Sequence, residues 1–443
     1  MKTFFIKHIF GLQTNTDVEI LCWIKNKRDH GGIIFFELED STGSIDSIVL
    51  KDSVSNNEYV QISKITIDSS VKVHGVTKNN TTKKGKQEIQ IISMLIIGTA
   101  SPKLEPSPRS LVNPFEKRYS KLILNKRHLY IRNSKIRSVF VIKYQMLSIL
   151  REWFKKYQFI EVDTPILTQT NIYDNNNTFN TDYFGTKVYL SQCAGLYLGA
   201  MVPTFEQVYT ITPAFRRESS KSPRHNPEFY HLKCQAAFCS LEDMMNFIEN
   251  MLFFLVNNLN TVSQVDLNNL NISINVQEFK PPYPKISYLS ALKILKSEGI
   301  DIEIGQSLNE KAETIITSKY NKPVFVTNMP AKVEPFLYKI MESDNRFTKT
   351  ADLLLPGGYG EILGVAEFIQ DSSQLLTRIN EKKYITEIEK QKIQWYVELC
   401  NFGNIPRSGF GMGVERLLRA LLKLPHIRDA FLFPRLYDHL PYP

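Results

Sequence analysis

Five basic side chains are concentrated in one short stretch of the chain. They are Arg216, Arg217, Lys221, Arg224 and His225. The apolar segment Val208–Ile211 precedes them and a second apolar segment starts at Phe229, so we expect a β-hairpin with a long basic loop. Cations at this density repel one another unless a polyanion binds among them, and a triphosphate is the obvious anion. A basic loop exposed to solvent is the alternative that charge alone leaves open.

Alternating glycines form a second candidate site. Gly409, Gly411 and Gly413 allow close approach of the backbone to a ligand or a neighbouring strand, and a helix is expected directly after them. A dinucleotide fingerprint is excluded, because Val414 stands where that loop needs a glycine. Arg416, one turn into the expected helix, could stack on the flat ring of a base. A solvent-exposed salt bridge is the alternative for this arginine.

Two carboxylates form a third candidate site. Asp352 and Glu361 flank a tight turn between apolar segments. Carboxylate oxygens are ligands that Mg²⁺ accepts alongside phosphate oxygens. The pair therefore predicts a magnesium site next to a triphosphate, with ordinary turn acids as the alternative.

These residues need a scaffold that brings them together. From about residue 120 onward the pattern is α+β: periodicity predicts helices at 136–157, 241–260, 308–318, 382–399 and 412–423, and strands at 323–327, 351–355 and 361–369. Residues 1–100 instead contain five short segments rich in β-branched and aromatic residues, which predicts a small closed β-barrel. A proline-containing linker, 101–120, separates the two parts.

Composition narrows the class of protein. The chain has 443 residues, of which 43% are hydrophobic and 22% charged, as in globular proteins. Its apolar runs are too short for a membrane helix, its N-terminus is a poor signal peptide, and its cysteines form no CxxC pair. We therefore expect a cytoplasmic protein without structural zinc. The net charge of +9 permits a nucleic acid or a nucleotide as partner.

Three sequence motifs, in order, resemble the signature motifs of class II aminoacyl-tRNA synthetases. They are the segment ending at Pro165, the pattern F-R-x-E…R-H-x-x-E-F of the basic hairpin, and the pattern G-x-G-x-G-x-E-R that ends at Arg416. Within that class the chain is similar to asparaginyl-tRNA synthetases over nearly its whole length, with matches at Arg127–Leu129, Trp395–Tyr396, Ser408–Gly411 and His426–Asp429. Trp23, Phe36, Asp40 and Gly43 look like the anticodon-binding barrel of that family.

The resemblance implies a fold and a set of partners. The fold is α+β, with an N-terminal five-stranded OB-type barrel (1–100), a linker (101–120) and a catalytic domain (121–443) built from an antiparallel sheet flanked by helices. ATP and Mg²⁺ would be the cofactors, and the motif ending at Pro165 implies a homodimer. No membrane contact is expected.

The resemblance also implies roles for the residues on the nucleotide side. Arg216 would bind the α-phosphate and the acid, Glu218 the adenine side, and Arg224 with His225 the β- and γ-phosphates; Phe229 and Arg416 would stack on the two faces of adenine, and Asp352 with Glu361 would hold Mg²⁺. Arg216, Glu361 and Arg416 would then be the catalytic residues. Each of these positions carries the residue type that the family pattern requires.

The amino-acid side departs from the family pattern. Lys233 replaces the acid that binds the α-ammonium, and Gln235 replaces the next acid of the family pattern. Phe368 replaces the arginine that contacts the side-chain carbonyl of the amino acid. Three further positions differ: Tyr173 replaces a loop glutamate, Gly195 replaces a glutamine two residues after Cys193, and Arg407 replaces a histidine. A lysine in place of an acid turns an attraction of up to ~4 kcal/mol, at ~4 Å and an effective dielectric of ~20, into a repulsion. Losing a charged hydrogen bond costs roughly 1.5–3 kcal/mol more. Free asparagine should then be strongly disfavoured.

We therefore expect a ligase that activates a carboxylic acid other than free asparagine as an acyl-adenylate, releases pyrophosphate, and passes the acyl group to a nucleophile such as an amine. Asp46, in place of a glutamine of the family barrel, makes tRNA a doubtful partner, although Arg28 and Phe36 remain. Two alternatives stay open: a divergent asparaginyl-tRNA synthetase that charges tRNA, and a non-catalytic nucleotide-binding protein.

Overall fold

The computed structural model describes residues 1–80, 86–101, 106–173 and 177–439. Part of the predicted linker, 102–105, lies outside the described residues. By its internal contacts the chain divides into two compact units, Met1–Arg137 and Ser138–Pro443. The division into 1–100, 101–120 and 121–443 stays a prediction. Among the described residues, no helix is both long enough and apolar enough to cross a membrane.

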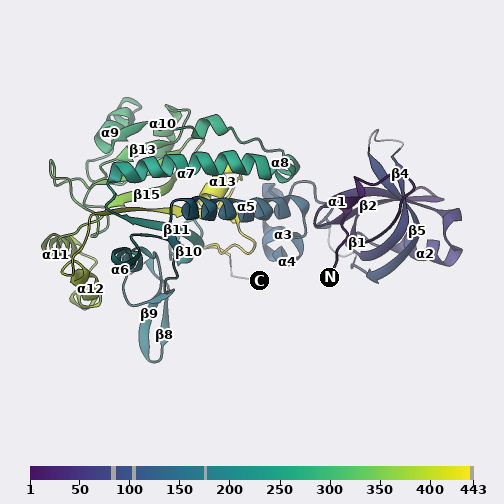
Figure 1. Cartoon of the computed structure of the whole chain (residues 1–443), viewed down its shortest axis with the longest axis horizontal. Helices are drawn as coiled ribbons and strands as arrows, with labels where there is room; N and C mark the ends of the chain where they lie inside the picture. Colours follow the sequence, from purple (N-terminus) through teal and green to yellow (C-terminus); the bar gives the residue numbers. More distant parts are fainter. Residues whose placement is uncertain (81–85, 102–105, 174–176, 440–443) are drawn as a thin grey trace. The chain divides into compact units, whose positions relative to one another are not determined.

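The first unit contains the predicted closed barrel, in the strand order β1-β2-β3-β5-β4 (Figure 1). Its strands are β1 (Asp17–Asp29), β2 (Ile33–Asp40), β3 (Gly43–Leu50), β4 (Ser70–Asn79) and β5 (Gln87–Gly98). Buried and exposed side chains alternate along β1 and β2, so every second residue packs in the barrel core. The first unit also contains four short helices: α1 (Ile6–Ile9), α2 (Asn56–Lys64), α3 (Ser120–Asn125) and α4 (Arg127–Tyr130).

The alternation corrects one expectation about the barrel. Phe36 packs in the core with 2% of its side chain exposed, so it cannot contact a base, whereas Phe35 is 42% exposed. Asp40 is also buried and pairs with Lys2. Asp46 accepts a hydrogen bond from the amide of Asn80.

The second unit is built on an eight-stranded sheet in the order β12-β13-β14-β15-β16-β11-β10-β6. Neighbouring strands are antiparallel except at the two ends, where β6 runs parallel to β10 and β12 parallel to β13. The strands are β6 (Ile160–Glu161), β10 (Gln207–Phe215), β11 (Glu228–Ala237), β12 (Lys285–Ser287), β13 (Val324–Thr327), β14 (Thr350–Leu355), β15 (Gly360–Glu367) and β16 (Arg407–Gly413). The predicted antiparallel sheet is confirmed.

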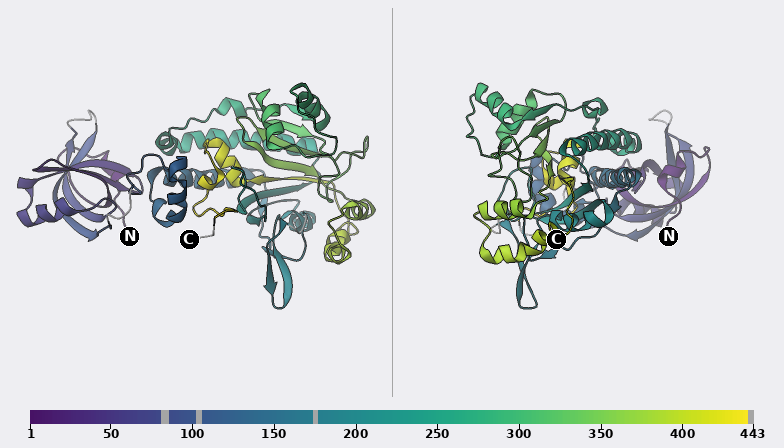
Figure 2. Two further views of the ribbon diagram at one scale, coloured as in Figure 1. Left: turned by 180° about the vertical axis from the view of Figure 1, so that it is seen from behind. Right: turned by 60° about the vertical axis from the view of Figure 1, so that its left-hand side comes forward.

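Two long helices, α5 (Ser134–Lys156) and α7 (Leu241–Val262), run side by side over this sheet (Figures 1 and 2). Trp153 of α5 contacts Phe254 of α7, with ring centroids 5.2 Å apart. Phe154 of α5 stacks on Tyr209 of β10 at 4.1 Å. The side chain of Ser240 caps the N-terminus of α7 by accepting a hydrogen bond from the N–H of Asp243.

The remaining elements pack around the sheet. Helices α10 (Glu310–Ser318), α12 (Glu387–Leu399) and α13 (Val414–Leu421) lie within the predicted ranges. Helices α6 (Gly195–Phe205), α8 (Gln264–Leu270), α9 (Tyr288–Ser297) and α11 (Ser372–Glu381) were not predicted. A separate three-stranded sheet joins β7 (Leu167–Thr168), β9 (Thr186–Leu190) and β8 (Asn180–Tyr183), and its β8–β9 hairpin extends away from the main sheet (Figure 1).

Candidate active site

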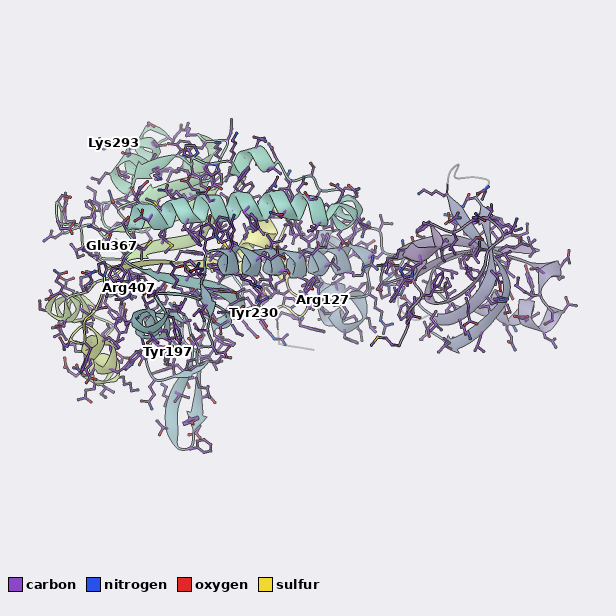
Figure 3. All side chains as sticks on the ribbon, viewed as in Figure 1. Arg127, Tyr197, Tyr230, Lys293, Glu367 and Arg407 are labelled. Atoms are coloured by element: carbon purple, nitrogen blue, oxygen red, sulfur yellow. The ribbon has the colours of Figure 1, made fainter. Side chains whose placement is uncertain are left out.

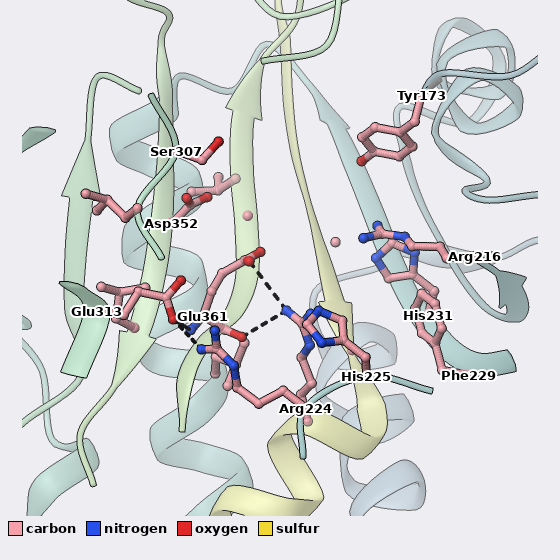
Figure 4. Close-up of a pocket in the computed structure, with 18 of the residues that line it drawn as sticks. Tyr173, Arg216, Arg224, His225, Phe229, His231, Ser307, Glu313, Asp352 and Glu361 are labelled. Carbon is pink, nitrogen blue, oxygen red and sulfur yellow. Dashed lines mark hydrogen bonds and ion pairs between the residues drawn. The ribbon is translucent and has the colours of Figure 1, made fainter. Parts of the chain in front are cut away.

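A cavity of about 300 Å³ opens over the strands β11, β14, β15 and β16 (Figure 4). Its lining includes every residue that was predicted to bind ATP or Mg²⁺: Arg216, Glu218, Arg224, His225, Phe229, Asp352, Glu361 and Arg416. These residues come from three segments that are far apart in sequence. The sheet brings the segments together because β11 pairs with β16, β16 with β15 and β15 with β14.

Arg216 directly follows β10, where the hairpin opens into its basic loop. Its N–H donates to the carbonyl of Pro227 at 2.8 Å, which fixes the start of the loop. The guanidinium lies over the ring of Tyr173, 5.1 Å from its centroid, and 5.5 Å from that of Phe229. Its Nε is buried without a hydrogen-bond partner within the described part of the chain. Two aromatic rings therefore hold a cation that has donors to spare for a ligand.

The tip of the basic loop is tied to neighbouring acids. Arg224 forms an ion pair with Glu313 of α10, and its Nε lies 3.8 Å from Glu310. His225 lies 3.6 Å from Glu218. Burial lowers the pKa of His225, and the nearby Arg416 lowers it further, while Glu218 opposes the shift. The loop therefore presents a neutral imidazole beside arginine cations near pH 7.

Arg416 reaches the same cavity from the first turn of α13. Its Nη1 donates to the carbonyl oxygen of Glu361 at 3.1 Å and lies 3.4 Å from the carboxylate of Glu361. The preceding residue, Glu415, is buried, accepts the N–H of Tyr230 at 3.0 Å and pairs with Lys143 at 2.6 Å. Glu415 thus anchors α13 to β11 and α5, and it aims Arg416 at the cavity.

Four acids also line the cavity: Asp352, Glu361, Glu313 and Glu334. Burial raises the pKa of Asp352 well above its usual value, and the charges of Glu361, Glu334 and Glu313 add to the shift. Burial also raises the pKa of Glu313, against the attraction of Arg224. A divalent cation beside Asp352 would relieve the repulsion between these carboxylates.

This donor set fits Mg²⁺ only with help from a ligand. No cluster of three or more His, Cys, Asp or Glu side chains arranged to hold a metal occurs among the described residues. Asp352 and Glu361 supply oxygen donors alone, which suits a cation that completes its shell with phosphate oxygens and water.

The residues predicted for the amino-acid side divide into two groups. Tyr173 and Lys233 line the cavity. Cys193, Gly195, Gln235, Phe368 and Arg407 are buried behind its surface. Gln235 donates to the carbonyl of Gly195 at 2.7 Å. Arg407, labelled in Figure 3, donates to Asn404 and Tyr396 and lies 5.3 Å from the ring centroid of Phe368.

Several cavity residues were missed by sequence reasoning. His231 lies two residues after Phe229 on β11, and alternation along the strand was the signal that could have found it. Glu313 and Glu334 come from a helix and a loop whose approach to the cavity only the fold reveals. Burial lowers the pKa of His231 far below its usual value, and the cations Lys233, Arg216 and Arg416 contribute. His231 is therefore neutral.

Family models agree with this architecture. The model described as "tRNA synthetases class II (D, K and N)" matches residues 119–437. The model described as "OB-fold nucleic acid binding domain" matches residues 18–97. The chain belongs to the class II tRNA synthetases of the D, K and N group, and it is an ATP-dependent, adenylate-forming ligase of that family. The predicted resemblance is confirmed.

Individual relatives give a finer likeness. The chain is 34% identical to the asparagine–tRNA ligase of Pyrococcus furiosus over 419 residues, which cover 94% of each chain. It is 31% identical to that of Desulforamulus reducens, covering 98% of this chain and 99% of the relative. The crystal structure of asparaginyl-tRNA synthetase from Pyrococcus horikoshii complexed with asparaginyl-adenylate superimposes with a TM-score of 0.94 at 33% identity, covering 100% of both chains.

Proposed function

We propose that this cavity activates a carboxylic acid with ATP and that the resulting acyl-adenylate is consumed by an acceptor. A carboxylate oxygen of the acid attacks the α-phosphorus, the bond to the β-phosphate oxygen breaks, and pyrophosphate leaves. The acceptor then attacks the acyl carbon and AMP leaves. The observation that carries this proposal is the convergence of all the predicted nucleotide-side residues on one cavity.

The roles of these residues follow from their positions. Arg216 would offset the charge that develops on the α-phosphate, since its guanidinium is held by two rings and retains a donor without a protein partner among the described residues. Phe229 and Arg416 would hold the adenine ring. Arg224 and His225 would contact the outer phosphates. Mg²⁺, bound by Asp352 and Glu361, would supply additional charge neutralisation.

The relatives favour asparagine as the acid and tRNA as the acceptor, because several carry the name asparagine–tRNA ligase at over 30% identity. The match of residues 18–97 to nucleic-acid-binding OB folds supports the same partner. Both observations favour the alternative, an asparaginyl-tRNA synthetase that charges tRNA, over our expectation of a ligase that activates another acid and has tRNA as a doubtful partner. We also propose a cytoplasmic homodimer.

A second candidate for the acid rests on Lys233. Its side chain lines the cavity although it is only 8% exposed. An ammonium there opposes the binding of a second ammonium next to the reacting carboxylate. This observation favours an acid that differs from free asparagine, with the chemistry of activation unchanged.

Pyrophosphate exchange into ATP tests the proposal. Purified protein is supplied with asparagine, with its deaminated analogue succinamate, and with other carboxylic acids, each with and without total tRNA. Exchange with asparagine together with acid-precipitable charging of tRNA would establish the first candidate. Exchange supported only by other acids would establish the second. No ATP binding and no exchange with any acid would overturn the activation itself.

A further inference from the structure

Lys233 is a buried cation whose ammonium group has no hydrogen bond or ion pair within the described part of the chain. It lies on β11 opposite Gly411 of β16. A Cβ at Gly411 would lie 2.6 Å from Cε and 3.0 Å from Nζ of Lys233, and a Cβ at Gly195 would lie 3.6 Å from Nζ. The lysine therefore occupies space that exists because both neighbours lack a side chain.

Position along β11 places this ammonium next to the reaction centre. Phe229, His231 and Lys233 alternate with residues that face the other side of the sheet, and all three line the cavity. Two residues of strand span about 6.8 Å, so Lys233 lies one step beyond His231 on the side away from the proposed adenine site. His231 is held neutral and supplies no counter-charge.

Glu334 is the complementary feature on another wall of the cavity. It lies in the loop between β13 and β14, and its carboxylate has no hydrogen bond or ion pair with any described residue. Burial and the charge of Glu361 raise its pKa to about 7, against the attraction of Lys382 and Arg378. A carboxyl group with this pKa is half ionised near neutral pH and gains from a cationic partner.

The two nearby cations are engaged with the backbone of the loop. Arg378 donates to the carbonyl of Ala331 at 2.7 Å and pairs with Glu381 at 2.6 Å. Lys382 donates to the carbonyls of Ala331 and Lys332 at 3.1 and 3.0 Å. These contacts hold the loop from behind and leave the carboxylate of Glu334 for the cavity, which it lines.

We infer that the acid is a polyfunctional one whose amino group binds Glu334 and whose second oxygen group, a hydroxyl or a carboxylate, accepts a hydrogen bond from Lys233. The reacting carboxylate lies toward Arg216. The positive and negative groups of this acid are reversed relative to an α-amino acid, in which the ammonium is adjacent to the reacting carboxylate. This inference rests on the proposed activation of an acid with ATP and deepens the second candidate.

Pyrophosphate exchange with a defined panel tests the inference. The probes are 3-amino-2-hydroxypropanoate, 4-amino-2-hydroxybutanoate and aspartate, which carry an amino group and a second oxygen group, with asparagine and succinamate as comparators. We expect at least one probe to exceed asparagine in kcat/KM. Glu334→Gln should raise KM for that probe about tenfold or more, because a charged contact is lost. The same variant should change KM for the corresponding acid without its amino group less than twofold.

Lys233→Met and a remote control complete the test. Lys233→Met should raise KM for the probe about tenfold or more. It should raise KM for the analogue without the second oxygen group much less. Lys296→Met, a substitution on α9 outside the cavity lining, should change neither value. The affinity for ATP, measured calorimetrically in each variant, shows whether a change affects nucleotide binding or only the binding of the acid.

The outcomes separate the proposed function from the inference about the acid. If the unmodified protein does not bind ATP, the proposed function is overturned. If ATP binds but asparagine exceeds every probe, or no probe supports exchange, the inference is wrong while nucleotide binding stands. If a probe supports exchange but Glu334→Gln weakens the probe and its amine-free analogue equally, the assignment of the amino group to Glu334 is overturned.

Discussion

At the scale of single residues, the charged side chains that line the cavity are held by different kinds of partner. Arg216 is held by aromatic rings, Arg224 by an ion pair with Glu313, and Arg416 by both the backbone carbonyl and the carboxylate of Glu361. Lys233 and Glu334 share the same cavity but form no ion pair with each other. A charge held by neutral groups stays available to a ligand, whereas a paired charge must first exchange partners.

The role of Arg216 can be separated from the general basicity of its loop. Arg216→Ala should lower the rate of pyrophosphate exchange about 10²–10³-fold, as for other groups that offset charge in a transition state. Arg217→Ala is the matched control, because its exposed side chain is adjacent in sequence and does not line the cavity. Steady-state exchange kinetics measure both. Equal losses in the two variants would contradict a specific role for Arg216.

Glu334 gives the protein a measurable dependence on pH. Because its folded-state pKa of about 7 lies above the ordinary value of 4.5, the folded chain binds the proton more tightly than the unfolded chain. The contribution of Glu334 to the unfolding free energy therefore falls as pH rises from about 4.5 to 7 and is constant above that range. Chemical denaturation of wild type and Glu334→Gln at a series of pH values should show a difference that changes across this window. A difference independent of pH would contradict the assignment.

At the scale of elements, the β-hairpins supply the site and the helices fix its position. Short segments rich in β-branched and aromatic residues predicted the barrel strands, and helical spacing predicted α5 and α7, because both patterns are local. The residues proposed for the nucleotide side could be predicted to lie together, because their types follow known motifs, and they do line one cavity. Glu313, Glu334 and the placement of Gln235 and Arg407 behind the cavity depend on strand register and on packing between distant segments, which no local pattern contains. Phe36 was expected to face a base, but Phe35 is the exposed residue. A difference of one residue along a strand reverses which side chain faces the core.

The turn between β14 and β15 offers a matched pair of glycines. Gly360 has φ +66°, and a Cβ there would fall on Arg224 and Glu313, whereas Gly358 has φ +80° and open space around it. Gly358→Ala should cost about 1 kcal/mol of unfolding free energy through backbone strain alone. Gly360→Ala should cost about 1–3 kcal/mol more because of the steric overlap, and it should also weaken ATP binding. Denaturation and calorimetry measure these effects, and equal effects at both positions would contradict the packing.

The barrel offers a second matched pair in β2. Phe36→Ala should cost about 3–5 kcal/mol of unfolding free energy, because it removes a large buried side chain. Phe35→Ala should change stability by less than about 0.5 kcal/mol, but it should weaken tRNA binding by about 1–3 kcal/mol if an exposed ring stacks on a base. Denaturation and filter binding measure the two quantities. If both variants bind tRNA as tightly as the wild type, β2 does not recognise RNA.

At the scale of the whole molecule, apolar residues are exposed at β6, the edge strand of the main sheet, and in the segment that follows it up to β7. Ile160, Ile166 and Leu167 are 44%, 40% and 43% exposed, in the segment around Pro165. A sheet edge of this kind is a surface that proteins usually cover. The proposed homodimer would cover it with a second copy of the chain.

Sedimentation velocity tests this proposal. Wild type should sediment as a dimer at micromolar concentration, and Ile166→Asp should shift the population toward monomer, because a charge would be buried in the contact. Ile388→Asp, at an exposed position of α12, is the control and should leave the dimer intact. A wild-type monomer at these concentrations would contradict the proposal.

The ion pair between Arg224 and Glu313 has a consequence for the energetics of nucleotide capture. One guanidinium cannot serve a helix carboxylate and a phosphate equally, so a phosphate that engages Arg224 competes with an anion built into the protein. If Arg224 binds a phosphate of ATP, as proposed, Glu313 competes with ATP for this guanidinium, and an anion of lower charge than ATP displaces Glu313 less well. The helix α10 would in this way make the cavity selective for highly charged phosphates at the expense of absolute affinity.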